Sequence, residues 1–437
     1  MRLCRYISAV VILALIGCQM TSYEGSYKDA HGGQAGQGDT PIPVSMTLGM
    51  ASGGANKPSG SSAKGSGPVE NLSQLDGGVM YVYAFSKDMR TSYETMGRDD
   101  MINTLIDGSL DRAGTRGGRR VEKVPGSLEL RWADSGSDVY YHSGNLNVLP
   151  FEFYAYYLGD LQATEADYIR TEDVIDIKVQ IDGHNDLMSA KAEVTKEQLA
   201  ALETEEERAN AVEYAYSYYT AQRNIVPTFY FKHHLARLEF ELVPKYVAGG
   251  SKRVLIKSIE VQSKYKARFT VAEKSHPSQL GLTFSDDVTL FELAEEDGSP
   301  IQDGRYDVST LTDPDETVEN IRIGGSLLVA SHKCPYCSGD GVDVETGETL
   351  TECRIDPLVI YLTMREVLPD GTVLDYVRNK IEIPDKDQAP VKLMAGNKYV
   401  IKFQLYGSTR VSADVSVEPW QPGGKIEVDT ESDKPNI

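Results

Sequence analysis

The chain has 437 residues, of which 65 are Asp or Glu and 44 are Lys or Arg, so its formal net charge is −21. This acidic balance argues against nucleic acids and anionic membrane surfaces as partners. Hydrophobic residues make up 41% of the sequence, enough to form real cores, and the length suits two domains better than one. The 25 tyrosines, against 10 phenylalanines and 2 tryptophans, are typical of half-buried strands and contact surfaces.

The N-terminus has the order of a secretory signal. Arg2 and Arg5 precede an apolar run over residues 7–16, which is too short to span a membrane permanently. The sequence LIGC that ends at Cys18 fits the lipobox of bacterial lipoproteins, in which the Cys thiol receives a lipid and becomes the new N-terminus. The alternative is an ordinary signal peptide with a chance Cys. We predict a signal peptide at residues 1–17 and lipidation at Cys18, which anchors the mature chain outside the cytoplasm without spanning the bilayer.

Residues 18–76 form a segment rich in Gly, Ser, Ala, Asn and Gln, which is typical of flexible chain. One stretch, IPVSMTLGM at residues 42–50, breaks this pattern. Its apolar and polar residues alternate, which predicts a strand with one apolar face formed by Ile42, Val44, Met46 and Leu48. Because a lone strand is not stable, we expect it to join a sheet formed elsewhere in the chain.

From residue 77 onward the sequence is rich in strand patterns. We expect strands at residues 79–85, 148–158 and 174–181, and two more near the C-terminus at 399–405 and 411–417. Between these groups, the capping boxes TKEQ (195–198) and TEEE (204–207) predict two consecutive helices. The second is expected to end by Asn224 and to place Ala211, Val212 and Ala215 on an apolar stripe against a sheet.

The stretch TFYFKHHLARLEFELVPKY follows Pro227 and alternates between apolar and polar residues. The alternation slips by one residue between Leu235 and Ala236, which predicts a β-bulge or a bend in the strand. His233 and His234 lie within this stretch, and neighbouring side chains in a strand point to opposite faces. We therefore expect His233 to be a hydrogen-bonded, partly buried side chain, and not to share a metal ion with its neighbour.

Three cysteines lie close together in SHKCPYCSGDGVDVETGETLTEC (331–353). A redox site needs its C-x-x-C motif at a helix N-terminus, whereas Cys334 and Cys337 are followed by turn residues and acids. A zinc site would require His332 to converge with these two and with Cys353. Thiols this close tend to oxidise outside the cytoplasm, so we favour a disulfide-closed loop on a hairpin, with the pairing open. We expect no bound metal and no cofactor.

Several motifs occur in an order that resembles one family. They are the lipobox, the isolated early strand, DLMSAKA (186–192), FKHHLARLEFEL (231–242) and VSADVSVEPWQPGG (411–424). Together they resemble the fimbrillin-like pilins and anchor subunits of Gram-negative type V pili, over most of residues 40–427. This resemblance implies an all-β fold of two transthyretin-like Greek-key β-sandwich domains with a short helical insertion. We place the domains at residues 77–223 and 224–427, followed by an acidic tail at 428–437.

The resemblance also implies a mechanism of assembly. The precursor reaches the outer membrane as a palmitate-bearing lipoprotein, and a protease then removes the lipidated segment together with the first strand. The groove so opened accepts a strand from the next subunit, by donor strand exchange. In the best-studied members that protease cuts after Arg, but no Arg lies between Cys18 and Arg90. Either another protease acts here, or the subunit keeps its lipid, as the family's anchor subunits do.

The sequence therefore favours a structural or anchor subunit of a cell-surface fimbria that contributes to adhesion. Its partners would be other pilin subunits, in a homo- or hetero-polymer, and the outer membrane through the lipid. The alternative is a non-polymerising surface lipoprotein that binds a glycan or a host protein through Tyr-rich loops. Neither is an enzyme, and the sequence contains no nucleophile elbow, no H-E-x-x-H motif and no phosphate-binding loop.

Overall fold

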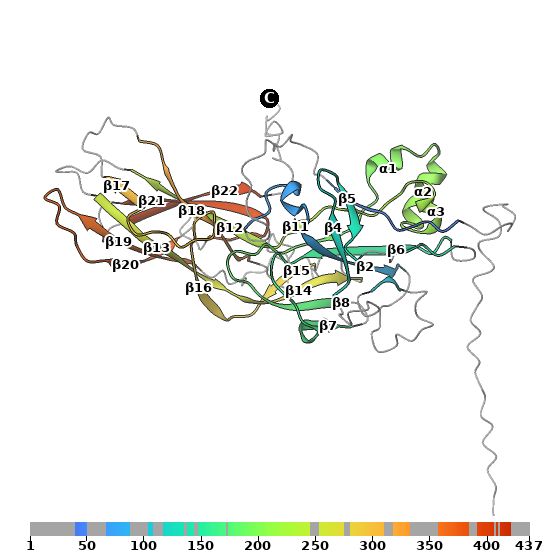
Figure 1. Cartoon of the computed structure of the whole chain (residues 1–437), viewed down its shortest axis with the longest axis horizontal. Helices are drawn as coiled ribbons and strands as arrows, with labels where there is room; N and C mark the ends of the chain where they lie inside the picture. Colours follow the sequence, from blue (N-terminus) through green and yellow to red (C-terminus); the bar gives the residue numbers. More distant parts are fainter. Residues whose placement is uncertain are drawn as a thin grey trace, which may run out of the picture. The chain divides into compact units, whose positions relative to one another are not determined.

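The computed structural model of the chain (Figure 1) is mostly β-sheet, which confirms the expected all-β fold class. It describes residues 40–49, 67–87, 104–107, 117–134, 138–143, 147–171, 174–244, 253–274, 280–309, 318–332, 357–383, 391–405, 408–409 and 411–420. Within these ranges no helix is long and apolar enough to cross a membrane.

Nine of the described strands form one sheet, here called the large sheet. Its order is β10-β1-β5-β4-β2-β6-β9-β11, with β3 also paired to β2. The strands are β1 (Met46–Leu48), β2 (Val79–Ser86), β3 (Thr104–Ile106), β4 (Arg119–Lys123), β5 (Glu129–Trp132), β6 (Phe151–Tyr157), β9 (Met188–Lys191), β10 (Thr228–Phe229) and β11 (Lys232–His233).

Three smaller sheets are built from the other described strands. The β8–β14 sheet has the order β15-β14-β8-β7 and contains β7 (Tyr168–Arg170), β8 (Val174–Gln180), β14 (Lys266–Glu273) and β15 (Gly281–Phe284). The β12–β21 sheet, in the order β18-β12-β21-β22, contains β12 (Leu235–Val243), β18 (Ile321–Ala330), β21 (Asn397–Leu405) and β22 (Val411–Pro419). The β13–β19 sheet has the order β16-β13-β19-β20, with β17 on β13, and contains β13 (Arg253–Lys264), β16 (Val288–Glu292), β17 (Tyr306–Ser309), β19 (Leu358–Val367) and β20 (Val377–Ile383).

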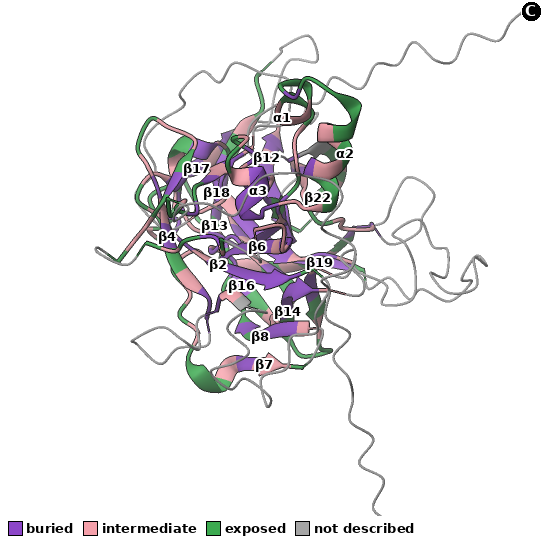
Figure 2. Cartoon of the chain, turned by 90° about the vertical axis from the view of Figure 1, so that its right-hand side faces the viewer, coloured by how far each residue is buried: buried purple, intermediate pink, exposed green. Residues whose placement is uncertain are grey.

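One continuous core lies between these sheets. On the large sheet, Tyr154 and Tyr156 are fully buried, and the Tyr156 ring meets the ring of Phe269 in the β8–β14 sheet edge to face at 6.3 Å. The same core continues through the other two sheets, where Phe240 and Phe403 stack at 6.0 Å. The purple strands β2, β6, β8 and β14 in Figure 2 show how far this burial extends. The Tyr-rich strands of the sequence are therefore mainly core strands.

The other face of the large sheet packs against a second core that includes the helical insertion. That insertion consists of α1 (Lys196–Ala200), α2 (Glu205–Glu213) and α3 (Tyr218–Ala221), which lie together in Figure 1. Both predicted capping boxes are present, because the hydroxyls of Thr195 and Thr204 accept the main-chain N–H of the residue three positions later. Short 3-10 turns are found at η2 (Leu72–Leu75) and η6 (Glu165–Asp167).

The predicted second helix is wrong in its length. Helix α2 ends at Glu213, and Tyr216 has a positive φ of 58°, which an α-helix cannot contain. Ser217 then caps the separate helix α3. As a result the expected apolar stripe is interrupted: Ala211 is fully buried, but Val212 is 50% exposed.

At two places the chain passes directly from one sheet to another. The chain leaves the large sheet after β11 and enters the β12–β21 sheet at Leu235, which is where the alternation of the sequence slips. Likewise β13 and β14 are separated only by Tyr265 but belong to different sheets. Strands β10, β11 and β14 therefore pair with strands that precede Asn224, across the boundary proposed between the two domains.

Candidate functional site

The strand expected at residues 42–50 is found as β1, with an isolated bridge from Pro43 to Tyr140, and Met50 lies outside the described residues. It occupies an internal position of the large sheet. On one side it runs antiparallel to β5, with Met46 opposite Leu130. On the other side it runs parallel to the two-residue strand β10, with Leu48 opposite Phe229. Removing this strand would separate β5 from β10.

Main-chain hydrogen bonds hold this segment on both sides. They run from Thr47 N–H to Pro227 O (2.9 Å), Gly49 N–H to Phe229 O (2.8 Å), Leu48 N–H to Leu128 O (2.8 Å), Val44 N–H to Val139 O (2.7 Å) and Tyr141 N–H to Ile42 O (3.1 Å). Contacts of this kind fix the position and direction of a strand, but they do not depend on its side chains.

The apolar side chains of the segment are buried in the second core, and we call the position between β5 and β10 that holds them the groove of β1. Val44, Met46 and Leu48 are 4%, 2% and 1% exposed, whereas Ser45 is exposed. Ile42 is half buried and packs against the same core. Full burial of an aliphatic side chain is worth about 1.5–3 kcal/mol, so these residues supply much of the energy that retains the strand.

Thr228 in β10 and Tyr230 directly after it contact β1 closely, and neither contact was predicted from the sequence. The hydroxyl of Thr228 lies 3.1 Å from that of Thr47. The ring of Tyr230 lies over Gly49, where a Cβ atom would stand 2.6 Å from the ring atom Cδ1 and closer still to Cζ and Cε1. Burial, and then the nearby carboxylates of Glu197 and Glu193, raise the pKa of the Tyr230 phenol, so it stays neutral and uncharged over the strand.

A second group of residues holds the chain at Val69, near the start of the described range 67–87. The Val69 N–H donates to the Asp186 carboxylate at 3.0 Å, and the Trp420 indole N–H donates to the Val69 carbonyl at 3.2 Å. His233 Nδ1 lies 2.8 Å from that Asp186 carboxylate. We call Asp186, His233 and Trp420 the anchor cluster. One residue further on, Glu70 forms an ion pair with Arg237 at 2.6 Å.

The anchor cluster does not form a hydrolytic triad. Asp186 lies beside His233, but the Ser189 hydroxyl contacts the other imidazole, that of His234, at 2.7 Å. The side chains of Asp186 and His233 are also closed to solvent, at 0% and 1% exposed. The arrangement therefore fixes chain segments to one another and offers no nucleophile with its base.

Several candidate residues lie outside the described residues. They are the lipidation residue Cys18 and the disulfide or metal candidates Cys334, Cys337 and Cys353, so the calls on them stay predictions. Of that proposed set only His332 is described; it follows β18, and its main-chain N–H donates to Leu393 O. Among the described residues there is no group of three or more His, Cys, Asp or Glu side chains arranged to hold a metal ion.

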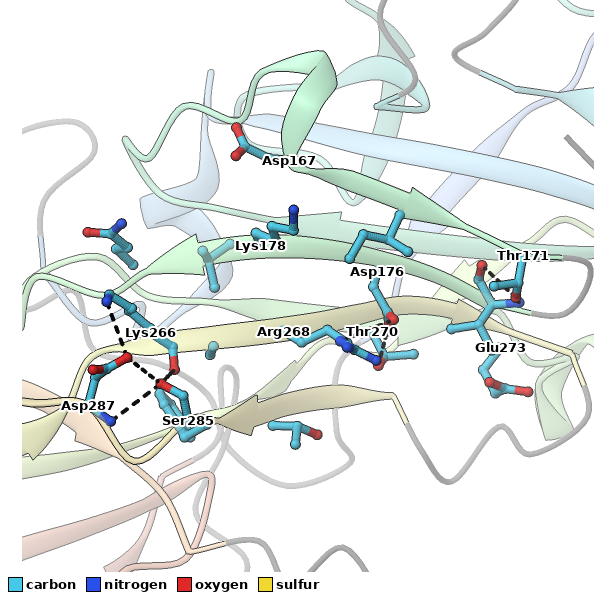
Figure 3. A pocket seen from close by; sticks show the side chains of 17 residues that line it. Asp167, Thr171, Asp176, Lys178, Lys266, Arg268, Thr270, Glu273, Ser285 and Asp287 are labelled. Carbon is cyan, nitrogen blue, oxygen red and sulfur yellow. Dashed lines mark hydrogen bonds and ion pairs between the residues drawn. The ribbon is translucent and has the colours of Figure 1, made fainter.

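A hollow of about 880 Å³ lies on the β8–β14 sheet (Figure 3). Its charged side chains largely pair with one another. Lys266 contacts Asp287 at 3.2 Å, and the Asp176 carboxylate accepts the Thr270 hydroxyl at 2.8 Å and lies 3.6 Å from Arg268. Acidic and basic side chains are mixed in its lining, so the hollow has no charge of one dominant sign, and the groove of β1 is the better candidate site.

Comparison with solved structures finds fimbrial proteins, as the sequence resemblance led us to expect. A fimbrial protein from Bacteroides vulgatus is 11% identical with a TM-score of 0.44, over 87% of this chain and all of that one. The fimbrial anchor protein Mfa2 from Porphyromonas gingivalis is 10% identical with a TM-score of 0.25, over 88% and 100% of the two chains. The tip fimbrial protein Mfa3 of the same organism is 7% identical with a TM-score of 0.29, over 86% and 99%.

No protein-family model and no curated protein sequence matches the chain. The TM-scores of the similar structures are low, so the function is argued below from the strands of this chain.

Proposed function

We propose that the chain is a structural or anchor subunit of a cell-surface fimbria, assembled by exchange of strand β1 for a strand of another subunit. The proposal rests on strand β1. This strand lies between β5 and β10 in the large sheet, although it belongs to a short segment, residues 40–49, that is separated from the other described residues. The first residues described after it begin at Gly67. The intervening sequence, MASGGANKPSGSSAKGS, is rich in Gly and Ser and typical of a chain that a protease can reach.

Loss of β1 would leave a slot that is costly to keep empty. Carbonyl groups at Pro227, Phe229, Leu128 and Val139 would lose their partners, at about 1–3 kcal/mol for each that stays buried. The apolar groove that holds Val44, Met46 and Leu48 would also be opened to water. Such a slot favours the addition of a strand with the same alternation from another subunit, and this is how strand exchange links subunits.

The absence of Arg between Cys18 and Arg90 bears on which role the chain plays. A protease that cuts after Arg has no site between Cys18 and Arg90, whereas one that cuts after Lys has sites at Lys57 and Lys64, between β1 and the segment that the anchor cluster holds at Val69. If neither acts, the chain retains β1 and the lipid at Cys18, and serves as an anchor at the outer membrane. We propose the anchor role for the uncut chain and the polymerising role for the cut chain.

The alternative of a binding lipoprotein with Tyr-rich loops receives less support. Most of the described tyrosines are buried, including Tyr83, Tyr154 and Tyr156. Among the large hydrophobic side chains in the described ranges that are exposed, Tyr140 is the only tyrosine, at 46%. The core thus accounts for most of the tyrosines in the described part of the chain.

The test is intact mass measurement and N-terminal sequencing of the protein purified from its native outer membrane. A lipid-modified terminus at Cys18 supports the anchor role, with β1 retained. A terminus between residues 51 and 66, in protein recovered from polymers, supports strand exchange. A terminus that is not lipidated, in protein that keeps β1 and never enters a polymer, contradicts both roles.

A further inference from the structure

We infer that the ring of Tyr230 restricts the groove of β1 to strands that carry glycine at the position of Gly49, three residues after the apolar residue at the position of Met46. The strand that fits is an extended segment of another subunit, with apolar residues at the positions of Val44, Met46 and Leu48, followed directly by glycine. This inference rests on the proposed function, since it describes which strand the same groove accepts.

The requirement for glycine comes from the ring and not from the backbone. Gly49 is not among the glycines with positive φ, so its conformation is open to any residue. A Cβ atom there would stand 2.6 Å from Cδ1 of Tyr230 and nearer to two other ring atoms. Non-bonded carbon atoms are normally about 3.5–4.0 Å apart, so even a methyl group overlaps the ring.

The backbone cannot move away easily to relieve that overlap. The Gly49 N–H donates to Phe229 O at 2.8 Å, so the strand is tied to the residue that directly precedes Tyr230. Leu48, on the other side, is 1% exposed and fixes the register of the strand from within the core. The methyl group can therefore be accommodated only if the Tyr230 ring shifts.

The backbone that carries the ring is fixed on both sides. Tyr230 is half buried, and its sequence neighbours Phe229 and Phe231 are 0% and 7% exposed. Its phenol lies near the carboxylates of Glu193 and Glu197, and its raised pKa reflects both burial and these charges. Because the neighbouring residues are fixed, the ring can move away only by rotation of the Tyr230 side chain. Overpacking of this kind typically weakens an association about 10- to 100-fold.

A cut full-length chain tests this selectivity. A recognition sequence for a specific protease is inserted between residues 51 and 66, and the chain is cut after it has folded. Labelled peptides with the sequence of residues 40–52 then compete for the groove. We expect a peptide with Gly49→Ala to bind about 10- to 100-fold more weakly than the natural peptide. A peptide with Ser45→Ala, at an exposed position, is the matched control and should bind within about 2-fold.

Enlarging the groove provides the decisive comparison. In a chain with Tyr230→Ala, the peptides with Gly49 and with Gly49→Ala should bind within about 3-fold of each other, because the overlapping ring is gone. If the two peptides bind equally to the chain that keeps Tyr230, the inference is wrong, although strand exchange itself stands. If the natural peptide never replaces the cut segment, the proposed exchange fails instead.

The uncut chain tests the ring contact independently of any exchange. Gly49→Ala should increase the unfolded fraction in denaturant about 10-fold or more, and Tyr230→Ala in the same chain should recover most of that loss. Equal stability of the natural chain and of Gly49→Ala would overturn the inference, whatever the peptides do.

Discussion

The imidazole of His233 stacks on the indole of Trp420, with ring centroids 3.7 Å apart and planes at 19°. His233 is the last residue of β11 in the large sheet, and Trp420 follows β22 in the β12–β21 sheet. The indole N–H of Trp420 also donates to the Val69 carbonyl. The stacked pair therefore links the large sheet and the β12–β21 sheet to the chain segment at Val69. A cut between residues 51 and 66 would therefore leave the new N-terminal segment held by the anchor cluster while β1 departs.

Asp186→Ala should lower the free energy of unfolding by about 3 kcal/mol. The carboxylate is buried, accepts the Val69 N–H and lies 2.8 Å from His233 Nδ1, so its loss leaves two buried polar groups without this partner. The measurement is denaturation by urea. Glu203→Ala, at an exposed position, serves as the control and should change the value by no more than about 0.5 kcal/mol. Equal effects would show that the anchor cluster contributes nothing to stability.

Met46→Ala should destabilise the chain by about 2–5 kcal/mol, because it removes a side chain that is 2% exposed from the groove under β1. Ser45→Ala, one residue away and exposed, should have almost no effect. Both are measured by the midpoint of urea denaturation in the full chain. If the two variants unfold at the same midpoint, β1 is not packed as described.

Local patterns in the sequence predicted local features well. The alternation of residues 42–48 correctly identified β1 and its buried face, and the capping boxes at Thr195 and Thr204 correctly marked two helix starts. The alternation of a strand and the two ends of a capping box each lie within a few residues, so the local pattern contains the information needed. The slip between Leu235 and Ala236 lies next to a change of sheet, but the register shift itself falls between Leu238 and Phe240, so the predicted position of the bulge is wrong.

Contacts between distant segments could not be predicted in the same way. Tyr230 lies over Gly49 because two segments about 180 residues apart run parallel in one sheet, and nothing near either residue indicates that register. In the sequence Gly49 looks like a turn residue beside a Gly-rich stretch. The end of α2 was missed for a related reason: the positive φ of Tyr216 reflects how the insertion packs on the large sheet, not its helix propensity.

Asp107→Ala should lower the free energy of unfolding by about 3–5 kcal/mol. Asp107 and Arg170 form a bidentate pair with N–O distances of 2.6 and 2.8 Å, and their side chains are 0% and 1% exposed. Removing the carboxylate leaves the guanidinium buried without its counter-charge, which costs more than the pair itself contributes. The double variant Asp107→Leu with Arg170→Met should therefore lose less stability than Asp107→Ala alone. A larger loss in the double variant, by urea denaturation, would contradict this account.

Stability should fall at alkaline pH because of buried phenols. Burial, as the main cause, raises the pKa of Tyr157 and of Tyr168 to about 12, above the ordinary value of about 10. Between these values the unfolded chain loses phenolic protons that the folded chain keeps. The unfolded state then binds fewer protons, and the free energy of unfolding decreases as pH rises.

The stabilising effect of each phenol is therefore complete below pH 10 and is lost as pH rises toward 12, at about 1.4 kcal/mol per pH unit and per group. Urea denaturation at stepwise pH values from below 10 to 12, with tyrosinate absorbance recorded in parallel, measures the slope. Tyr157→Phe should reduce that slope by the contribution of one group, because the phenylalanine ring fills the same space but does not titrate. An unchanged slope in this variant would mean that Tyr157 titrates alike in the folded and unfolded chains.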